Sequence, residues 1–251
     1  MKILKGICIA FSIYSKIPMP QFAWEEEDME YMMCFFPWIG AVIGVVFVLW
    51  HALCERCGIG TLCGSLIAAA IPLAISGGFH VDGYMDTMDA FHSYQSKEKK
   101  LEILKDSHIG AFAVIMVILY YLIDIAALSE IKTMQAAILV GTGFPMARCF
   151  SGLGVMWLAP AREEGMLHTF AKDARKKIVA GVLLVQLVLL CGLDLWLSVT
   201  GGLAVIVTAL VCFLYFRWKS YRELGGITGD TAGFFVTVCE AAIAAAVAII
   251  M

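Results

Sequence analysis

The chain of 251 residues lacks a basic tract, an internal repeat and a second cysteine pair. Its net charge is −3, so nothing in the composition favours a nucleic-acid partner. Cys54 and Cys57 form a lone C-x-x-C near Cys63, whereas a zinc site would need a further ligand pair. Most of the nine cysteines lie in apolar segments, where a free thiol packs as a small hydrophobe. No small-residue cleavage site follows the short apolar stretch at the N-terminus, so we expect this stretch to be retained.

Apolar residues, in contrast, make up 61% of the chain, compared with about half in soluble domains. Several apolar runs approach or exceed the roughly 18–20 residues that cross a bilayer as a helix. The sequence therefore predicts an all-α, polytopic membrane bundle that forms a single domain over residues 1–251. Residues 1–33 are expected to form an interfacial N-terminal segment. The predicted transmembrane helices, seven in all, cover residues 34–53, 59–76, 110–128, 134–158, 178–193, 196–216 and 232–251.

The basic residues set the predicted orientation, because cytoplasmic loops of membrane proteins carry an excess of Lys and Arg. The loops on the opposite side hold only Arg56 and Lys132. We therefore expect residues 77–109 and 217–233 to face the cytoplasm, in a multi-pass protein of the cell inner membrane. The basic residues assigned to that side are Lys97, Lys99, Lys100, Lys105, Arg162, Lys172, Arg175, Lys176, Lys177, Arg217, Lys219 and Arg222, together with Lys2, Lys5 and Lys16.

An acidic motif follows the second predicted span, from Gly77 to Asp89. If this stretch is helical, Asp82, Asp86 and Asp89 lie within about 60° of one another on one face. Such like charges repel one another, and near a bilayer each carboxylate also carries a desolvation cost. A divalent cation offsets both, and oxygen ligands of this kind suit Mg²⁺ bound together with substrate phosphates. The alternative is an acidic helix face balanced by nearby lysines.

A glycine-rich motif precedes the last predicted span, from Leu224 to Gly233. Its glycines permit close backbone approach to a ligand, and Thr228 or Asp230 is placed to cap the following helix. A turn that opens a helix binds anions through unpaired N–H groups and the helix dipole. We therefore predict a phosphate-binding turn, with Asp230 as a further metal ligand. A simple flexible turn is the alternative.

Two charged residues lie inside predicted spans, Arg148 in the fourth and Glu240 in the last. A charge at the centre of a span costs about 2.5–3.5 kcal/mol on insertion scales, so Arg148 either faces a polar interior or snorkels. Its expected partner is a substrate phosphate or one of the aspartates. Glu240 is expected to contact the metal or Arg148, or to form a structural contact between helices.

Together these motifs resemble the cobalamin synthase family. The resemblance rests on residues 77–89, on the Lys105-Asp106-Ser107 stretch with Gly110, and on residues 224–233 followed by Glu240. Residues 36–40, Arg148 and residues 160–165 also match, so the resemblance covers essentially the whole chain in order. The chain departs from the family pattern at Ala90-Phe91-His92 and at Phe234, so the family pattern does not predict the conformation of the loops at these positions.

The resemblance implies a phosphotransferase for substituted phosphate groups that acts in the last steps of cobalamin biosynthesis. Such an enzyme joins adenosylcobinamide-GDP to α-ribazole or its 5′-phosphate, releases GMP and requires Mg²⁺. By this resemblance the metal ligands are Asp82, Asp86, Asp89 and Asp230. Arg148, Lys105 and Arg162 would offset charge on the leaving GMP, and His80 or a cluster aspartate would accept the hydroxyl proton. The predicted backbone contacts to substrate come from Gly225, Gly226, Thr228 and Gly229.

Two other functions are compatible with parts of the sequence. A CDP-alcohol phosphotransferase also uses aspartates at a membrane face, but its motif has Ala-Arg after the first Asp-Gly, where this chain has Tyr84-Met85. A secondary transporter would use Arg148, Glu240 and Asp124 for coupling, yet the repeat symmetry typical of transporters is missing. The lipid bilayer is the expected environment, and the sequence is compatible with a homo-oligomer.

Overall fold

The computed structural model describes residues 2–162 and 174–251, and it is an all-α bundle over these ranges. The only β-type pairing among the described residues is an isolated bridge between Pro160 and Ile227. Within the described ranges, six helices are long and apolar enough to cross a membrane, or seven if one bent pair counts as a single span. The predicted all-α polytopic architecture is therefore confirmed.

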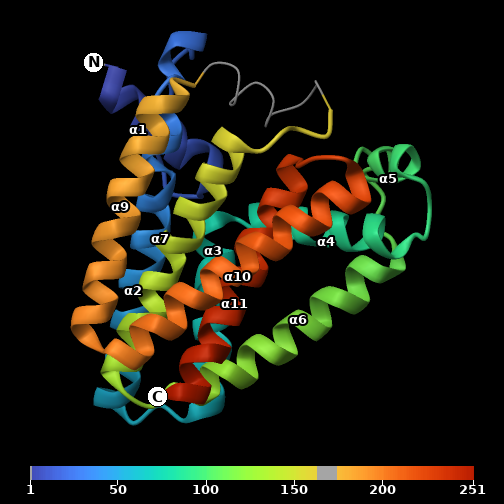
Figure 1. The fold of residues 1–251 in the computed structure, drawn as a ribbon. Coiled ribbons are helices and arrows are strands. Elements are labelled where there is room, and N and C mark those ends of the chain that lie inside the picture. Colours follow the sequence, from blue (N-terminus) through green and yellow to red (C-terminus); the bar gives the residue numbers. More distant parts are fainter. Residues whose placement is uncertain (1, 163–173) are drawn as a thin grey trace.

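Each predicted span coincides with a helix, and two further helices lie between the second and third spans (Figure 1). Residues 77–109, predicted as a connecting loop, hold these two helices, and of residues 217–233 only the turn at 225–228 is not helical. The helices are α1 (Lys2–Tyr14), α2 (Phe36–Cys57), α3 (Thr61–Ser76), α4 (Phe79–His92), α5 (Lys97–Ile103), α6 (Ala111–Ser129), α7 (Met134–Trp157), α9 (Lys176–Leu197), α10 (Val199–Leu224) and α11 (Gly229–Ile250), with short 3-10 turns at Glu26–Asp28 and Met32–Phe35.

Helix α7 forms the centre of the bundle, and 94% of its most apolar stretch of 18 residues is buried. It packs most extensively against α2, where small residues let the two backbones touch. A Cβ at Gly40 would lie 2.6 Å from the Phe144 carbonyl carbon, and one at Gly44 would lie 2.9 Å from the Gly141 carbonyl carbon. Because lipid provides no hydrophobic drive between helices, this close packing is what holds the centre together.

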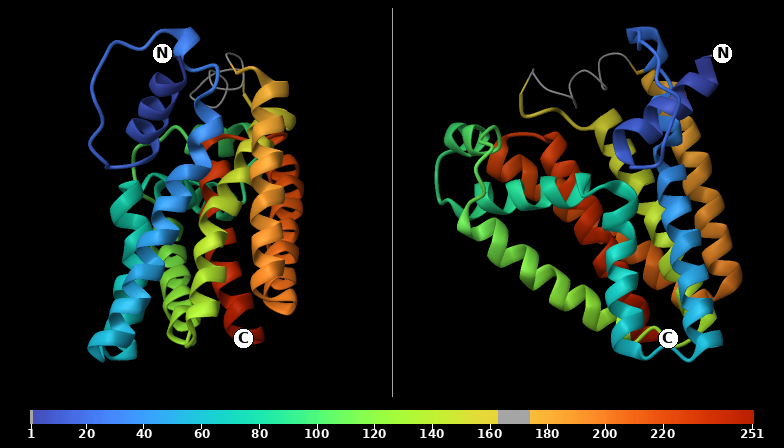
Figure 2. Two further views of the ribbon diagram at one scale, coloured as in Figure 1. Left: turned by 90° about the vertical axis from the view of Figure 1, so that its left-hand side faces the viewer. Right: turned by 180° about the vertical axis from the view of Figure 1, so that it is seen from behind.

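Two consecutive glycines turn the chain sharply between α3 and α4. Gly77 and Gly78 have φ angles of +67° and +84°, in the left-handed region that only glycine adopts without strain. The axes of α3 and α4 are bent by 97° at this point. Helix α4 consequently leaves the direction of the span and runs across the bundle (Figures 1 and 2). We therefore treat α3 as the membrane-spanning part and α4 as lying outside it.

The connections sort to two ends of the molecule (Figures 1 and 2). The α10–α11 turn, α5 and the start of α9 lie toward the end that carries α1. The α2–α3 and α6–α7 turns and the C-terminus lie at the opposite end. The basic loops expected on one side of the membrane are thus on one side of the bundle, while Lys172 falls outside the described residues.

We predict that Gly44→Ala destabilises the protein, because its new methyl group would collide with the α7 backbone. The expected loss is about 1–3 kcal/mol, as for other overpacked cores. Gly181→Ala is the matched control, since a Cβ there meets nothing within 4 Å. Thermal unfolding in detergent measures both. Equal midpoints for Gly44→Ala and Gly181→Ala would contradict the close α2–α7 contact.

Candidate active site

The acidic and the glycine-rich motifs meet where α4 crosses α11. A Cβ at Gly83 would lie 2.9 Å from the Asp230 carbonyl oxygen and 3.0 Å from its Cα atom. A Cβ at Gly233 would lie 3.1 Å from the His80 carbonyl oxygen. A side chain at either position would push the helices apart, so both glycines are needed for this approach. Two segments about 150 residues apart in sequence are thereby placed against each other.

The turn before α11 is fixed by hydrogen bonds rather than flexible. Gly225 ends α10 with a φ of +83°, and a Cβ at Gly226 would lie 2.6 Å from the Ala159 carbonyl oxygen. The Ile227 N–H donates to that oxygen over 3.0 Å, and the Ala161 N–H donates back to the Ile227 carbonyl over 2.8 Å. The turn is therefore bound to the segment that follows α7.

Of the two residues that the sequence offers as a cap for α11, Thr228 and Asp230, the structure shows Thr228 in this role. Its hydroxyl accepts from the Thr231 N–H over 3.1 Å, while the Thr231 hydroxyl accepts from the Thr228 N–H over 2.8 Å. This reciprocal pair is a capping box, which satisfies two of the unpaired N–H groups at the helix start. Asp230 lies in the first turn, where the helix dipole favours a negative charge.

The aspartates of the two motifs are electrostatic neighbours. Partial burial raises the pKa of Asp86 to about 6, and the charges of Asp82, Asp230 and Asp89 add to this rise. Asp82 is exposed, whereas Asp86 and Asp230 are partly buried. A guanidinium nitrogen of Arg162 lies 3.8 Å from an Asp230 carboxylate oxygen. Carboxylates from α4 and α11 therefore share one region of negative charge with a single arginine at its edge.

Asp89 has a second task in the structure. Its carboxylate accepts from the Gly110 N–H over 2.7 Å and from the Ala113 N–H over 2.8 Å, so it caps the start of α6. A Cβ at Gly110 would lie 2.5 Å from an Asp89 oxygen, which explains the glycine there. Both oxygens are thus already engaged, and metal ligation by Asp89 stays a prediction.

His80 lies away from the aspartates. Counted at 100° per residue along α4, it is about 120–180° around the helix axis from Asp82, Asp86 and Asp89. Its ring packs among Tyr14, Phe36 and Phe79, with ring centres 5.6–6.2 Å apart. Burial, with a smaller contribution from Arg148, lowers the pKa of His80 well below its ordinary value. The structure thus places a neutral imidazole on the core side of α4.

Arg148 pairs with Glu240 inside the bundle. One guanidinium nitrogen lies 2.6 Å from a Glu240 oxygen and also donates to the Phe144 carbonyl over 2.9 Å. Arg148 is 1% exposed and the Glu240 side chain 9% exposed. Glu240 is thus the partner of Arg148 among those that the sequence left open. Arg148 does not snorkel, and it does not contact an aspartate of the acidic motif. A direct role on substrate stays a prediction.

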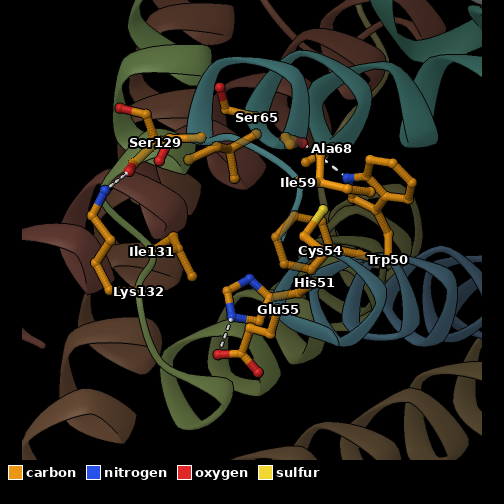
Figure 3. Close-up of a pocket in the computed structure, with 14 residues that line it drawn as sticks. Trp50, His51, Cys54, Glu55, Ile59, Ser65, Ala68, Ser129, Ile131 and Lys132 are labelled. Carbon is orange, nitrogen blue, oxygen red and sulfur yellow. Dashed lines mark hydrogen bonds and ion pairs between the residues drawn. The ribbon is translucent and has the colours of Figure 1, made fainter. Parts of the chain in front are cut away.

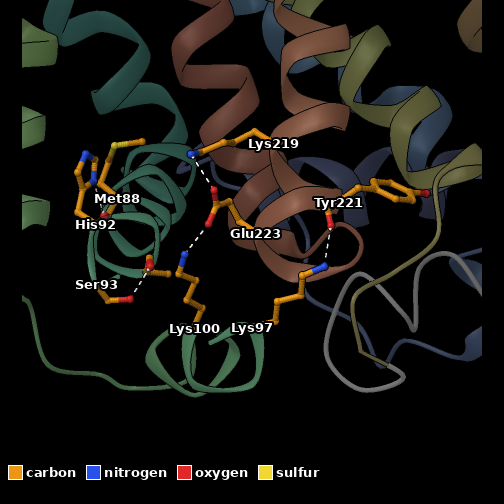
Figure 4. A network of polar contacts seen from close by, with 9 residues as sticks. Met88, His92, Ser93, Lys97, Lys100, Lys219, Tyr221 and Glu223 are labelled. Atoms are coloured by element: carbon orange, nitrogen blue, oxygen red, sulfur yellow. Dashed lines mark hydrogen bonds and ion pairs between the residues drawn. The ribbon is translucent and has the colours of Figure 1, made fainter. Parts of the chain in front are cut away.

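A polar network joins α5 to α10 beside the site (Figure 4). Glu223 accepts from Lys100 and, over 3.0 Å, from Lys219. Lys97 donates to the Tyr221 carbonyl over 3.4 Å. Lys100 and Lys97 contact residues of α10 that are more than 100 positions away in the sequence, so no local pattern predicts these two contacts, whereas Lys219 and Glu223 have the i,i+4 spacing of a helix pair. Lys105, predicted to bind substrate, follows α5 and is exposed.

The donor set suits magnesium better than a closed metal cage. In residues 2–162 and 174–251 no three His, Cys, Asp or Glu side chains are arranged to hold a metal ion by themselves. Magnesium is usually held by one or two carboxylates, with water and substrate phosphates completing its octahedron. Asp82, Asp86 and Asp230 supply such carboxylates at the α4–α11 crossing, so the residues present fit the predicted ion.

A separate cavity lies at the other end of the bundle, between the α2–α3 turn and the α6–α7 turn (Figure 3). It has a volume of about 180 Å³. His51 lies 3.5 Å from Glu55, and the Trp50 indole donates to the Gly64 carbonyl over 2.9 Å. The cavity and the aspartates thus lie at opposite ends of the bundle.

Comparison with known proteins gives a consistent result. A family model described as cobalamin-5-phosphate synthase matches residues 6–248. An adenosylcobinamide-GDP ribazoletransferase of Lachnoclostridium phytofermentans is 42% identical over 96% of this chain and 92% of its own. Proteins of the same name from Clostridium botulinum and Desulfitobacterium hafniense are 32% and 29% identical, over 95% and 96% of this chain and 94% and 95% of theirs. No solved structure matches. The segment 160–165 also resembles the family in sequence, but its residues 163–165 lie outside the described residues.

We predict that Arg148→Met and Glu240→Leu each destabilise the bundle by about 3–5 kcal/mol, because each leaves a buried charge without its partner. The double variant should recover most of that loss, since it removes both charges. Thermal unfolding of the four proteins in detergent completes the cycle. Additive losses in the double variant would mean that the two side chains do not depend on each other.

Proposed function

The chain belongs to the cobalamin-5-phosphate synthase family, whose relatives carry the name of a transferase of cobalamin biosynthesis, and from that premise we propose its reaction. The enzyme joins adenosylcobinamide-GDP to α-ribazole or its 5′-phosphate and releases GMP, with Mg²⁺ bound. The observation that carries the proposal is the crossing of α4 and α11, which gathers Asp82, Asp86 and Asp230 beside Arg162.

The reaction exchanges a phosphoanhydride bond for a phosphate ester bond. A hydroxyl oxygen of the ribazole forms a bond to the cobinamide-side phosphorus of the pyrophosphate. The bond from that phosphorus to the bridging oxygen breaks, GMP leaves with the bridging oxygen, and the hydroxyl proton passes to a base. Phosphoryl transfer of this kind depends on positioning and charge neutralisation rather than covalent catalysis. A helix start, together with a cation that the acidic cluster would hold, would supply both.

Each part of the site has a role in this proposal. Carboxylates among Asp82, Asp86 and Asp230 would hold the metal together with water and substrate phosphate, and the metal would supply neutralisation of the pyrophosphate charge. Asp89 keeps α4 fixed against α6 through its bonds to Gly110 and Ala113. The start of α11 binds phosphate oxygens through its N–H groups. The partly buried Arg162 and the exposed Lys105 offset charge on the leaving GMP.

The proton acceptor is an aspartate of the cluster. His80 is the other candidate from the sequence, but its ring is enclosed by Tyr14, Phe36 and Phe79 on the opposite side of α4. A general base must come within about 3 Å of the proton that it accepts, directly or through one water molecule. We assign His80 and Arg148 to positioning, since both lie in the core behind the aspartates.

The site is proposed to face the cytoplasm from the cell inner membrane. The basic connections lie at the end of the bundle that carries the site, which is the cytoplasmic end by the positive-inside rule. At a membrane surface the bulky, amphipathic corrinoid rests at the interface while its nucleotide part reaches the aspartates. A transporter or a CDP-alcohol phosphotransferase is not favoured by the family to which the chain belongs.

We predict that Asp82→Asn and Asp86→Asn each lower GMP release by at least about 100-fold, because loss of one metal carboxylate removes several kcal/mol of charge stabilisation. The assay supplies purified protein in detergent with Mg²⁺, adenosylcobinamide-GDP and α-ribazole. Glu102→Gln is the control, since it makes the same chemical change on the exposed surface of α5. Near-normal turnover in both Asn variants would remove the metal assignment.

We also predict that chelation of divalent ions abolishes GMP release and that added Mg²⁺ restores it. The carboxylate cluster repels the pyrophosphate unless a cation lies between them. Zinc should substitute poorly, since the proposed ligands are all oxygen atoms. Full turnover in excess EDTA would show that the reaction needs no metal.

A further inference from the structure

A small cavity lies inside the bundle, where α3, α6, α7 and α11 face one another. Its volume of about 10 Å³ is at the lower limit for one water molecule, which needs roughly 10–15 Å³. Two carboxylates line it, Asp124 of α6 and Glu240 of α11. Asp124 follows Ala113, whose N–H bonds to Asp89, by eleven residues, or about 16 Å along α6. The cavity is therefore separate from the carboxylates of the proposed magnesium site.

Asp124 is buried without a hydrogen bond. It is 8% exposed, and across residues 2–162 and 174–251 no N–H or O–H group donates to its carboxylate and no cationic side chain pairs with it. A carboxylate inside a membrane span is costly unless it is paired, hydrogen-bonded or bound to a metal ion. The charge of Asp124 therefore needs a partner that the described side chains do not supply.

The charged groups at the cavity carry one net negative charge. Arg148 donates to one oxygen of Glu240 over 2.6 Å, and these two charges cancel. The other oxygen of Glu240 accepts no hydrogen bond from the described residues. Asp124 adds a second negative charge, with which Arg148 does not pair. A monovalent cation would make the interior neutral, whereas a divalent ion would leave an uncompensated positive charge.

The wall of the cavity supplies further oxygen atoms. Tyr120 also lines it, one helical turn before Asp124 on the same face of α6. Pro72 lies inside α3 and has no N–H, so the Ala68 carbonyl lacks its usual helical partner. Both Ala68 and Pro72 line the cavity, and carbonyls freed at breaks in membrane helices are known ligands of sodium ions. Carboxylate, hydroxyl and carbonyl oxygens together form a donor set for a hard cation.

We propose that this cavity binds one sodium ion, held by Asp124, Glu240, the Tyr120 hydroxyl and the Ala68 carbonyl. The charge balance selects a monovalent ion, and a cavity this small favours sodium over the larger potassium ion. The ion links α6 to α3 and α11. Helix α6 benefits from such a link, because only 22% of its most apolar stretch of 18 residues is buried. This site goes beyond the proposed reaction and does not depend on it.

Thermal unfolding of the full chain in detergent tests the site without an activity assay. The protein is exchanged into choline chloride with EDTA, and NaCl or KCl then replaces choline chloride at constant ionic strength. Because a ligand that binds only the folded state stabilises it, saturating NaCl should raise the midpoint by at least about 3 °C. KCl should leave the midpoint close to its value in choline chloride. Equilibrium binding of radioactive sodium should give one ion per chain.

Two variants assign the ion to this cavity. Asp124→Asn should lose both the sodium response and the binding of radioactive sodium, because it removes the charge that the ion balances. Tyr120→Phe, which removes one oxygen and keeps the ring, should weaken sodium binding by about 10-fold. Glu130→Gln is the control, since it makes a similar change at an exposed position just after α6 and should respond to sodium as the wild type does.

Three results would overturn the proposal. Equal midpoints of the wild type in all three salts, without sodium binding, would mean that Asp124 is neutralised by a proton. An equal rise in NaCl and KCl would be a general salt effect. An unchanged sodium response in both Asp124→Asn and Tyr120→Phe would place the ion elsewhere in the protein. Because GMP release enters none of these measurements, they stand or fall separately from the proposed function.

Discussion

The contact between the backbones of α4 and α11 is the constraint on which the site depends. Gly83 rests on Asp230 and Gly233 rests on His80, so neither helix has a side chain to separate the two. This approach places carboxylates of distant sequence origin in one electrostatic field, although their mutual repulsion opposes it. α11 packs on α7, the Asp89 cap ties α4 to α6, and the Thr228 capping box stabilises the start of α11. These contacts position each of the two helices despite that repulsion.

The bend at Gly77 and Gly78 links this contact to the membrane. It turns α4 out of the direction of α3, so the aspartates lie across one end of the bundle instead of inside a span. Like charges are far less costly there, where water and cations reach them, than in hydrocarbon. Arg148 and Glu240 form an ion pair in the bundle interior and neutralise each other. This buried pair is distinct from the exposed or partly exposed charges that are proposed to act on substrate.

Local patterns predicted much of this arrangement, and long-range contacts account for what they missed. Helical periodicity placed Asp82, Asp86 and Asp89 on one face, and residue type predicted the Thr228 cap. The same periodicity puts His80 on the opposite face of α4, although His80 lies close to the aspartates in the sequence. The partner of Arg148, the bonds of Asp89 to α6 and the position of Lys16 over Gly77 depend on which helices pack together. No local pattern in a single sequence records that information.

The central claim is that α4 and α11 hold one divalent ion together. Electron paramagnetic resonance of Mn²⁺, titrated into the protein with bound adenosylcobinamide-GDP, tests it most directly through the variants Asp86→Asn, Asp230→Asn and their combination. A shared ion predicts that each single variant weakens Mn²⁺ binding by about 10-fold or more and that the combined loss is not additive. Wild-type affinity in Asp230→Asn, with the loss confined to Asp86→Asn, would contradict the account.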